Sequence, residues 1–272
     1  MILLRLKGGL GNQLFQLGAA IRLAKNNIDQ IRLDKSLLSD SQKTILNELI
    51  NKPDLIPKVI ENEELELFKS DAKKIFSISD SDNGPFSDNL QLDWEIDFNK
   101  INILLEGYFQ CDKNIYALKK YIGILNNVTS NLFLNKNSEN LVIHYQQEDY
   151  PNIDLQRDLD LIKLDYIDRA IDTFSSDRII EIHSKTIGIL ERYHHKKNIE
   201  LKIGENEIET FNKFMSAQKL VIPNSTFSLS AALLSDNLLL LIRPSIWSKK
   251  YIFDELTNNY KNSIHIIQNS FY

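Results

Sequence analysis

Cysteine is nearly absent from this chain of 272 residues, which contains only Cys111. A single cysteine excludes an internal disulfide and any metal site built from several thiolates. It also fits a reducing compartment, in which disulfides rarely persist.

Long apolar runs are missing too. The longest covers residues 238–242, which is the length of a strand and far below the roughly 20 residues that a membrane-spanning helix needs. The apolar start, residues 2–6, is too short for the apolar region of a signal peptide. We therefore expect a cytoplasmic protein, for which peripheral contact with the inner face of a membrane stays open.

The charge pattern contains no basic stripe. The formal net charge is −5, with 43% hydrophobic and 25% charged residues, which are ordinary values for a globular protein. A chain of this length buries a substantial core as one large domain or two modest ones. The negative balance argues against nucleic acid as a partner.

Glycine is scarce as well, with nine residues, yet three of them stand within four positions: Gly8, Gly9 and Gly11. A strand pattern precedes this cluster and a helical pattern follows it. Such a turn lets the backbone approach a ligand closely, and it points the free N–H groups of the helix at an anion. The two familiar phosphate loops do not fit, because Gly-Lys-Ser/Thr is absent here and Leu14 replaces the last glycine of the dinucleotide fingerprint.

Strand and helix patterns alternate along the chain, which predicts an α/β fold with parallel sheets. A polar stretch at residues 135–140 is the candidate linker, so we expect one domain over residues 1–135 and a second over residues 136–272. In the second half, strands are expected at residues 141–145, 178–182, 220–222 and 238–242. With helices between them, these strands predict a doubly wound sheet, in which ligands lie beyond the carboxyl ends of the strands.

Four segments resemble one known family. Residues 8–16, Gly-Gly-Leu-Gly-Asn-Gln-Leu-Phe-Gln, are similar to the N-terminal signature of the alpha-1,2-fucosyltransferases, glycosyltransferase family 11. Three further segments follow the order of that family's motifs: residues 106–110, 144–150 and 221–228. Together the segments span nearly the whole chain.

The resemblance implies a GT-B fold, with two Rossmann-like domains that face each other across a cleft. The N-terminal domain is then the acceptor side, and the C-terminal domain binds the nucleotide-sugar. The implied activity is inverting, metal-independent transfer of fucose from GDP-fucose, without a cofactor. The implied acceptor is a hydroxyl of an oligosaccharide or lipid-linked glycan, in the synthesis of a bacterial surface polysaccharide or O-antigen.

The same resemblance implies donor-binding residues in two turns. In the first turn these residues are Gly9, Gly11 and Asn12; in the second they are Asn224, Ser225, Thr226 and Phe227, which would contact the diphosphate. The residues of the second turn support this reading independently, because hydroxyls and free N–H groups at the start of a helix form an anion site. A plain helix cap is the alternative interpretation.

The chain departs from the family at the third segment. Gln146 and Gln147 stand where the family has two arginines, and Glu148 stands where it has glycine. An arginine there would form a bidentate, charge-assisted contact with the donor phosphates, and its loss costs about 1.5–3 kcal/mol. In a metal-independent transferase this loss falls on the rate, because the charge stabilises the departing diphosphate.

A second departure concerns the family's Phe-Ser-Asp-Asp stretch, whose place is taken by Ile182-His183-Ser184-Lys185. Either His183, Lys185 or Arg243 supplies the phosphate charge and the donor differs from GDP-fucose, or the site has decayed. The alternatives to a fucosyltransferase are therefore the same fold with another nucleotide-sugar, and a non-catalytic relative that binds a glycan or a nucleotide.

Inversion needs a group that removes the acceptor proton, usually a carboxylate or a histidine. Asp149 is retained from the family motif, and its neighbour Glu148 is a second candidate. His144, at the end of an apolar strand pattern, is expected to contact donor or acceptor, although a buried core histidine is the alternative. We expect no metal at His194 and His195, because adjacent helical residues face different ways.

Overall fold

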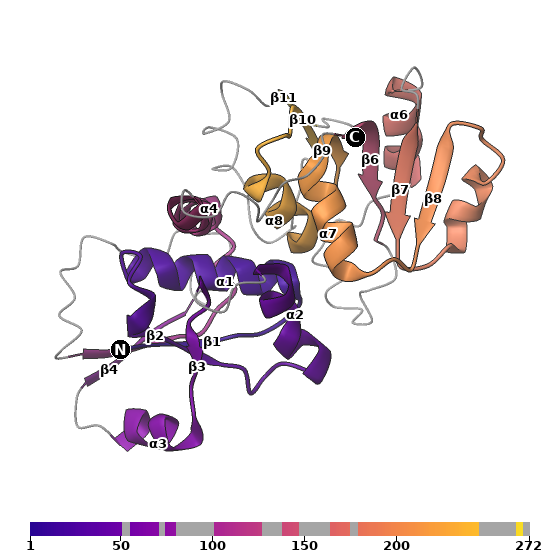
Figure 1. Ribbon diagram of the computed structural model, residues 1–272. Helices are drawn as coiled ribbons and strands as arrows, with labels where there is room; N and C mark the ends of the chain where they lie inside the picture. Colours follow the sequence, from indigo (N-terminus) through magenta and orange to yellow (C-terminus); the bar gives the residue numbers. More distant parts are fainter. Residues whose placement is uncertain are drawn as a thin grey trace. The chain divides into compact units, whose positions relative to one another are not determined.

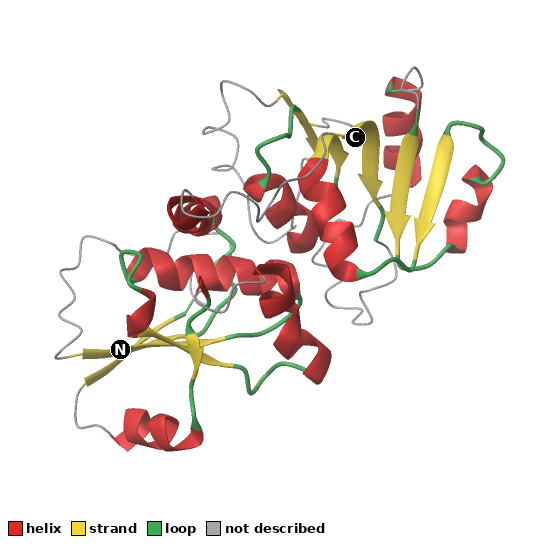
Figure 2. Ribbon diagram, viewed as in Figure 1, coloured by secondary structure: helices red, strands yellow, loops and turns green. Residues whose placement is uncertain are grey.

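The computed structural model describes residues 1–50, 55–70, 74–79, 101–126, 138–146, 164–174, 179–244 and 265–268. The chain divides into two compact units, Met1–Leu132 and Phe133–Tyr272. Each unit contains one parallel sheet with helices packed on it (Figure 1). Helices and strands alternate along the chain (Figure 2), so the expected α/β class is confirmed.

The sheet of the first unit has the strand order β3-β2-β1-β5-β4. Every pair of neighbouring strands is parallel. The central strand β1 is buried on both faces, since Ile2, Leu3 and Leu4 are at most 1% exposed, as parallel sheets require. The strands are β1 (Ile2–Arg5), β2 (Ile31–Asp34), β3 (Lys58–Val59), β4 (Lys74–Ile78) and β5 (Ile101–Leu105).

Helices α1 and α4 of the first unit pack closely against each other. A Cβ atom added at Gly18 would lie 2.0 Å from the backbone oxygen of Asn114, so glycine lets α1 approach the start of α4. The Arg22 side chain of α1 donates to the Asn114 side chain across the same contact, at 3.3 Å. The helices are α1 (Leu10–Leu23), η1 (Ile28–Gln30), α2 (Asp40–Ile50), α3 (Asn62–Ser70) and α4 (Asp112–Asn126).

The sheet of the second unit has the strand order β11-β10-β9-β6-β7-β8 and is also parallel throughout. Renumbered from the start of the unit, this is the 3-2-1-4-5-6 order of the doubly wound dinucleotide-binding fold. The strands are β6 (Ser138–His144), β7 (Ile180–Ser184), β8 (Ile199–Ile203), β9 (Ala217–Val221), β10 (Leu240–Arg243) and β11 (His265–Gln268). The helices are α6 (Leu164–Thr173), η3 (Gly188–Tyr193), α7 (Glu207–Ser216) and α8 (Thr226–Leu234).

Two details of the second unit differ from the expectations. Strand β6 begins at Ser138, inside the polar stretch expected as a linker, because the start of β6 pairs irregularly with β9 and Asn140 bonds Glu181. Strand β8 was not expected, since it alternates charged and apolar residues at the outer position beside β7. No helix within the described ranges is long and apolar enough to cross a membrane.

Candidate functional site

The four family-like segments lie in pairs at the points where the strand order of each sheet reverses. In the first unit, residues 7–16 follow β1 and residues 106–110 follow β5; these strands are neighbours, with β2 on the other side of β1 and β4 on the other side of β5. In the second unit, residues 144–146 end β6 and residues 222–228 follow β9, which is again the reversal point. Open parallel sheets bind ligands beyond the carboxyl ends of the strands at this point.

The glycine turn, residues 7–11, connects β1 to α1. Gly8 has a φ of +78°, and a Cβ there would lie 2.5 Å from Asn12 Nδ2, so the turn requires glycine at this position. Gly9 is exposed and precedes the first residue of α1, with no atom within 4 Å of the place where its Cβ would be. Gly11 is buried in the first turn of α1. Backbone at Gly9 is therefore open to close approach.

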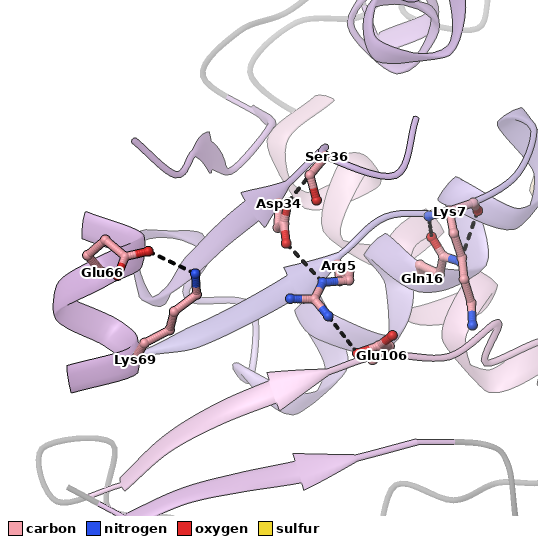
Figure 3. Close-up of polar contacts among 8 residues, drawn as sticks. All are labelled: Arg5, Lys7, Gln16, Asp34, Ser36, Glu66, Lys69 and Glu106. Atoms are coloured by element: carbon pink, nitrogen blue, oxygen red, sulfur yellow. Dashed lines mark hydrogen bonds and ion pairs between the residues drawn. The ribbon is translucent and has the colours of Figure 1, made fainter. Parts of the chain in front are cut away.

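Two buried glutamines hold the glycine turn in place. Gln16 accepts from the Lys7 N–H and donates to the Lys7 carbonyl, both at 3.1 Å (Figure 3). Gln13 donates to the carbonyls of Gly8, at 3.1 Å, and Gln42, at 3.2 Å. Both glutamines are 0% exposed. These family-like residues therefore stabilise the turn, and donor binding by Gly9, Gly11 and Asn12 stays a prediction.

A hydrogen bond joins the two family-like segments of the first unit. Gln110 donates to Asn12 Oδ1 at 2.9 Å. Phe109, beside Gln110, is buried and has a φ of +49°, a conformation that costs energy for a bulky residue. Tyr108 is 36% exposed and carries the Lys7 ammonium 4.4 Å from its ring centre. The residues after β1 and β5 thus form one connected surface.

A charged triad, which the sequence analysis did not predict, lies at the ends of β2 and β1 and directly after β5. Arg5 donates through Nε to Asp34 and through Nη1 to Glu106, both at 2.9 Å (Figure 3). The Asp34 side chain is 5% exposed and the Glu106 side chain 40%. Burial favours neutral Asp34, but hydrogen bonds from Ser36 and Arg5 outweigh it and lower its pKa. The only available signal was Arg5 itself, a charge within an apolar strand.

The turn between β9 and α8 exposes an uncapped helix start. Ser225 is the N-cap residue of α8, with extended backbone, but its side chain makes no capping hydrogen bond. Ser225 thus occupies the cap position of the plain helix-cap interpretation, although its hydroxyl does not cap the helix. Asn224 and Ser225 are 6% exposed, whereas Thr226 and Phe227 are half-buried. The first N–H groups of α8 point beyond the carboxyl end of β9, where an anion binds favourably.

His144 connects the end of β6 to α8. Its Nδ1 lies 2.9 Å from Ser228 Oγ, and its ring packs against Phe214 and Phe227 with centroid distances of 5.0 and 5.9 Å. The side chain is 8% exposed. Gln146, two residues later, is half-buried. The candidate bases Glu148 and Asp149 lie outside the described residues.

His183 lies between two carboxylates at the end of β7. Its Nδ1 is 2.9 Å from Glu205 and its Nε2 is 3.6 Å from Glu181. Burial disfavours ionised Glu181, but hydrogen bonds from His183, Lys213 and Asn140 outweigh it and lower its pKa to about 2. Lys185 is exposed beyond the strand. The imidazole therefore faces internal carboxylates, and the phosphate contact expected of His183 remains only a prediction.

The last rung of the second sheet carries a row of basic side chains. His144 pairs in register with His183, and His183 pairs with Lys202. On the other side, β9 pairs with β10 at Val221 and Ile242, which places Arg243 beside Ile222. We call Lys202, His183, His144 and Arg243 the basic row.

Strand alternation gives the four side chains of the basic row the same face of the sheet. The preceding rung points to the opposite face, where Ile182, Ile143, Val221 and Ile242 belong to the apolar cluster packed on α6. The face of the basic row is therefore that of α7 and α8, as the packing of His144 and His183 on Phe214 shows.

Arg243 is one of the two most enclosed side chains of the basic row, with 3% exposure, the same as His183. The hydroxyl of Tyr166 donates to the Ile222 carbonyl at 3.2 Å, beside the position of Arg243. Burial raises the pKa of Tyr166, and the charge of Arg243 partly opposes this. Arg243 thus acts electrostatically on the Tyr166 hydroxyl, which lies at the end of β9.

The adjacent His194 and His195 follow η3. Their ring planes are inclined by 74° and their centroids are 5.8 Å apart. In the part of the chain that the structure describes, no group of three or more histidine, cysteine, aspartate or glutamate side chains is arranged to hold a metal ion.

Comparisons with known proteins give structural similarities alone, since no family model and no curated protein sequence matches the chain. The structure is similar to that of NodZ alpha-1,6-fucosyltransferase soaked with GDP-fucose, with a TM-score of 0.45 and 12% identity over 86% of this chain and 92% of that one. NodZ co-crystallised with GDP gives 0.44 and 12% over the same shares. E. coli heptosyltransferase WaaC with ADP gives 0.43 and 11%, over 89% of this chain and 86% of that one.

Proposed function

We propose that the chain is a glycosyltransferase of GT-B type, which binds a nucleoside-diphosphate sugar on its second unit and transfers the sugar to a glycan hydroxyl. One observation carries this proposal. The four segments that resemble alpha-1,2-fucosyltransferases meet in pairs at the two reversal points, joined by Asn12 to Gln110 in one unit and by His144 to Ser228 in the other. Segments with no common site would have no reason to converge in this way.

The donor's diphosphate fits the second unit because the carboxyl edge of its sheet offers groups that bind an anion. The uncapped start of α8 offers N–H groups, and the unused hydroxyls of Ser225 and Thr226 lie beside them. Arg243 is buried, and its backbone lies beside Ile222 at the start of the same turn; charges act strongly where water is excluded. The family has arginines where this chain has Gln146 and Gln147. The charge of Arg243 would replace the charge of those arginines.

The reaction we propose is a single displacement with inversion. The acceptor hydroxyl attacks the anomeric carbon, a base takes its proton, and the electron pair of the broken bond leaves with the nucleoside diphosphate. In this metal-independent reaction, the charge of Arg243 and the N–H groups at the start of α8 would stabilise the departing nucleoside diphosphate. Fucose from GDP-fucose, an acceptor in bacterial surface polysaccharide or O-antigen synthesis, and peripheral membrane association belong to the same proposal.

A different donor is the second candidate. It is favoured by His183, which faces Glu205 and Glu181 where the family has an acidic pair. A changed set of side chains at the end of β7 changes the groups offered to the nucleoside. Another GDP-, UDP- or dTDP-sugar would then be the substrate, and the diphosphate contacts at α8 would be the same.

Thermal unfolding with nucleotides tests the proposal. GDP, UDP, dTDP and CDP are each added to the full chain, with the matching nucleosides as controls. A ligand at 100 times its dissociation constant stabilises the folded state by about 2.7 kcal/mol. Stabilisation by GDP alone supports the fucosyltransferase form, and stabilisation by another diphosphate supports the second candidate. No response to any nucleotide contradicts the proposal and favours a non-catalytic relative.

A further inference from the structure

We propose that the second unit binds the anionic surface of a membrane through the segment between β7 and β8, residues 185–197. The inference rests on the proposed function, from which it takes the peripheral membrane association, and it assigns that association to one surface of one unit. We call five exposed side chains of this segment the apolar–basic patch: Ile187, Ile189, Arg192, Lys196 and Lys197.

The segment is anchored on the unit by two buried side chains. Leu190 and Tyr193 of η3 are fully buried and belong to the apolar cluster that packs on α6. The Tyr193 hydroxyl donates to Asp168 of α6 at 2.7 Å, and the Leu190 N–H donates to the Ile187 carbonyl at 2.8 Å. The helix η3 also contacts the neighbouring strand β8 (Figure 1). The exposed side chains are therefore carried by an ordered turn.

Two large apolar side chains of this turn are turned toward solvent. Ile187 is 44% exposed and Ile189 is 46% exposed. Side chains three positions apart lie on the same side of a 3₁₀ helix, so Ile189 shares its side of η3 with Arg192. Single exposed apolar residues are common on protein surfaces. Here, however, two of the three large hydrophobic side chains that are exposed in the described part of the second unit stand within three positions.

Basic side chains flank the two isoleucines. The segment contains four lysines or arginines and one glutamate, whereas the whole chain has 32 basic and 37 acidic residues. The Arg192 guanidinium and the Lys196 ammonium lie 5.3 and 5.5 Å from the centre of the Tyr193 ring, so both charges gather around one side chain. Asp168 pairs with Arg192 at 3.0 Å. Lys196 and the exposed Lys197 therefore provide most of the positive charge that the patch offers to a partner.

This combination of side chains fits an anionic lipid surface. Each lysine or arginine near such a surface strengthens binding about fivefold, and apolar side chains beside the charges enter the boundary between headgroups and acyl chains. A nucleic acid would use the charges but would leave the isoleucines in water, and four basic residues are few for such a partner. The paired isoleucines therefore favour lipid.

The apolar–basic patch and the proposed diphosphate site lie on different faces of the second sheet. The buried side chains of η3 belong to the cluster on the face of α6, whereas the basic row lies on the face of α7 and α8, as the packing of His183 on Phe214 shows. Membrane binding should therefore not compete with nucleotide binding, and the two can be measured separately.

Co-sedimentation of the full chain with lipid vesicles tests the inference. The vesicles consist of phosphatidylcholine alone, or of phosphatidylcholine with roughly one third phosphatidylglycerol, which supplies the anionic headgroups. We expect binding to the anionic vesicles to be tighter by about tenfold or more. This preference should disappear in about 1 M salt, where the Debye length is about 3 Å.

Two double variants test the two parts of the patch. Ile187→Ser with Ile189→Ser removes the apolar contribution, and Lys196→Gln with Lys197→Gln removes two charges. Each pair should weaken binding to the anionic vesicles about 10- to 30-fold. The side chains changed are exposed, so the melting temperature should stay the same, which shows that the variants fold.

The matched controls alter similar side chains elsewhere in the chain. Leu239→Ser changes the third exposed hydrophobic side chain of the second unit, just before β10, which is four strands from β8 in the sheet. Lys119→Gln with Lys120→Gln removes two adjacent lysines of α4 in the first unit. Both controls should bind the anionic vesicles within about twofold of the unaltered chain.

The same preparations separate this inference from the proposed function, because the melting temperature is also measured with GDP, UDP, dTDP and CDP. Equal binding to both kinds of vesicle, or none, overturns the inference. It is also overturned if the isoleucine pair binds like the unaltered chain, since charge alone would then serve an acidic protein or a nucleic acid. A nucleotide response without vesicle binding removes the patch and leaves the proposed function. Vesicle binding without a nucleotide response supports the patch and contradicts the proposed glycosyltransferase.

Discussion

Both sheets are parallel, but their carboxyl edges carry opposite chemistry. At the first edge, glycines form the turn, buried amides hold it, and one arginine faces two carboxylates. At the second edge, a serine opens the helix without capping it, and a row of basic side chains lies across the strands. The fold places both edges, and the side chains determine what each edge offers to a ligand.

The two edges also differ in how their charges are balanced. The triad of the first edge is partly exposed at Glu106, whereas Arg243 and His183 of the second edge are each 3% exposed. The basic side chains of the second edge are thus enclosed in the protein, whereas one carboxylate of the first edge is open to solvent. The two edges therefore offer different groups to a ligand, and variants of each unit can test what each edge binds.

Arg243→Gln should have the largest effect on the second edge. Loss of a preorganised charge beside the departing diphosphate should lower kcat about 100-fold and weaken nucleoside-diphosphate binding about tenfold. Nucleoside binding should change little, so the preference for diphosphate over nucleoside is the quantity to measure by calorimetry. Arg243→Lys keeps the charge and should recover part of the preference.

The control for Arg243→Gln is Arg192→Gln, which removes an exposed arginine paired with Asp168 in the same unit. It should leave both affinities unchanged. If Arg243→Gln weakens guanosine and GDP equally, the arginine supports the fold of the edge and does not serve the diphosphate.

Gly18→Ala tests whether the first unit can be weakened without loss of nucleotide binding by the second. The added Cβ would lie 2.0 Å from the Asn114 backbone oxygen, so α1 and α4 must separate, at a cost of about 2 kcal/mol of unfolding free energy. Gly123→Ala in α4 is the matched control: its Cβ would have no atom within 4 Å, and alanine there should stabilise by about 0.5–1 kcal/mol. An equal loss of stability in both variants would contradict the packing argument.

Acid should weaken the second unit through Glu181. Hydrogen bonds lower its pKa to about 2 in the folded chain, against about 4.3 when unfolded. The folded state is therefore favoured above pH 5, and this contribution, about 3 kcal/mol, is lost as the pH falls from 5 toward 2. Denaturant unfolding across that range should show the loss in the unaltered chain and a smaller slope in Glu181→Gln. Glu200→Gln, at the exposed pair with Lys202, should keep the slope.

The sequence predicted the parts of this fold that depend on local pattern. Apolar runs such as that of β1, followed by helical spacing, indicated the alternation of strands and helices, and both sheets are parallel as expected. Strand β8 was missed, because its alternating charged residues suit an outer strand and resemble a surface loop. Asn140 lies in the stretch that the sequence predicts as a linker, because its hydrogen bond to Glu181 is not visible in the sequence.

The candidate site likewise has parts that local sequence patterns predict and parts that they do not. Turns that follow strands were predictable, since Gly9 and Ser225 each stand between a strand pattern and a helix pattern. The triad of Arg5, Asp34 and Glu106 was not predictable, because Arg5 is separated from Asp34 by 29 residues and from Glu106 by 101. Only the order of strands β2, β1 and β5 brings them together. The basic row depends likewise on register, which the spacing of residues within one strand does not contain.

Gln146→Arg has the smallest expected effect. It tests directly whether an arginine at this position strengthens diphosphate binding at the second edge. Gln146 follows β6 at the reversal point of the second sheet and is half-buried. An arginine there adds a charge-assisted donor on the side of the turn opposite Arg243, and should tighten diphosphate binding by up to about tenfold, or about 1.4 kcal/mol. Gln146→Lys, as a control, supplies charge without the bidentate geometry and should gain less.

The double variant decides between two descriptions of the second edge. If Arg243 carries the charge that position 146 lacks, Gln146→Arg should recover most of the binding that Arg243→Gln loses, and the two effects should not add. If the two positions serve different purposes, their effects on the diphosphate dissociation constant will add within about 0.5 kcal/mol. Additive effects would leave the anion site at α8 but would remove Arg243 as the substitute for the motif arginines.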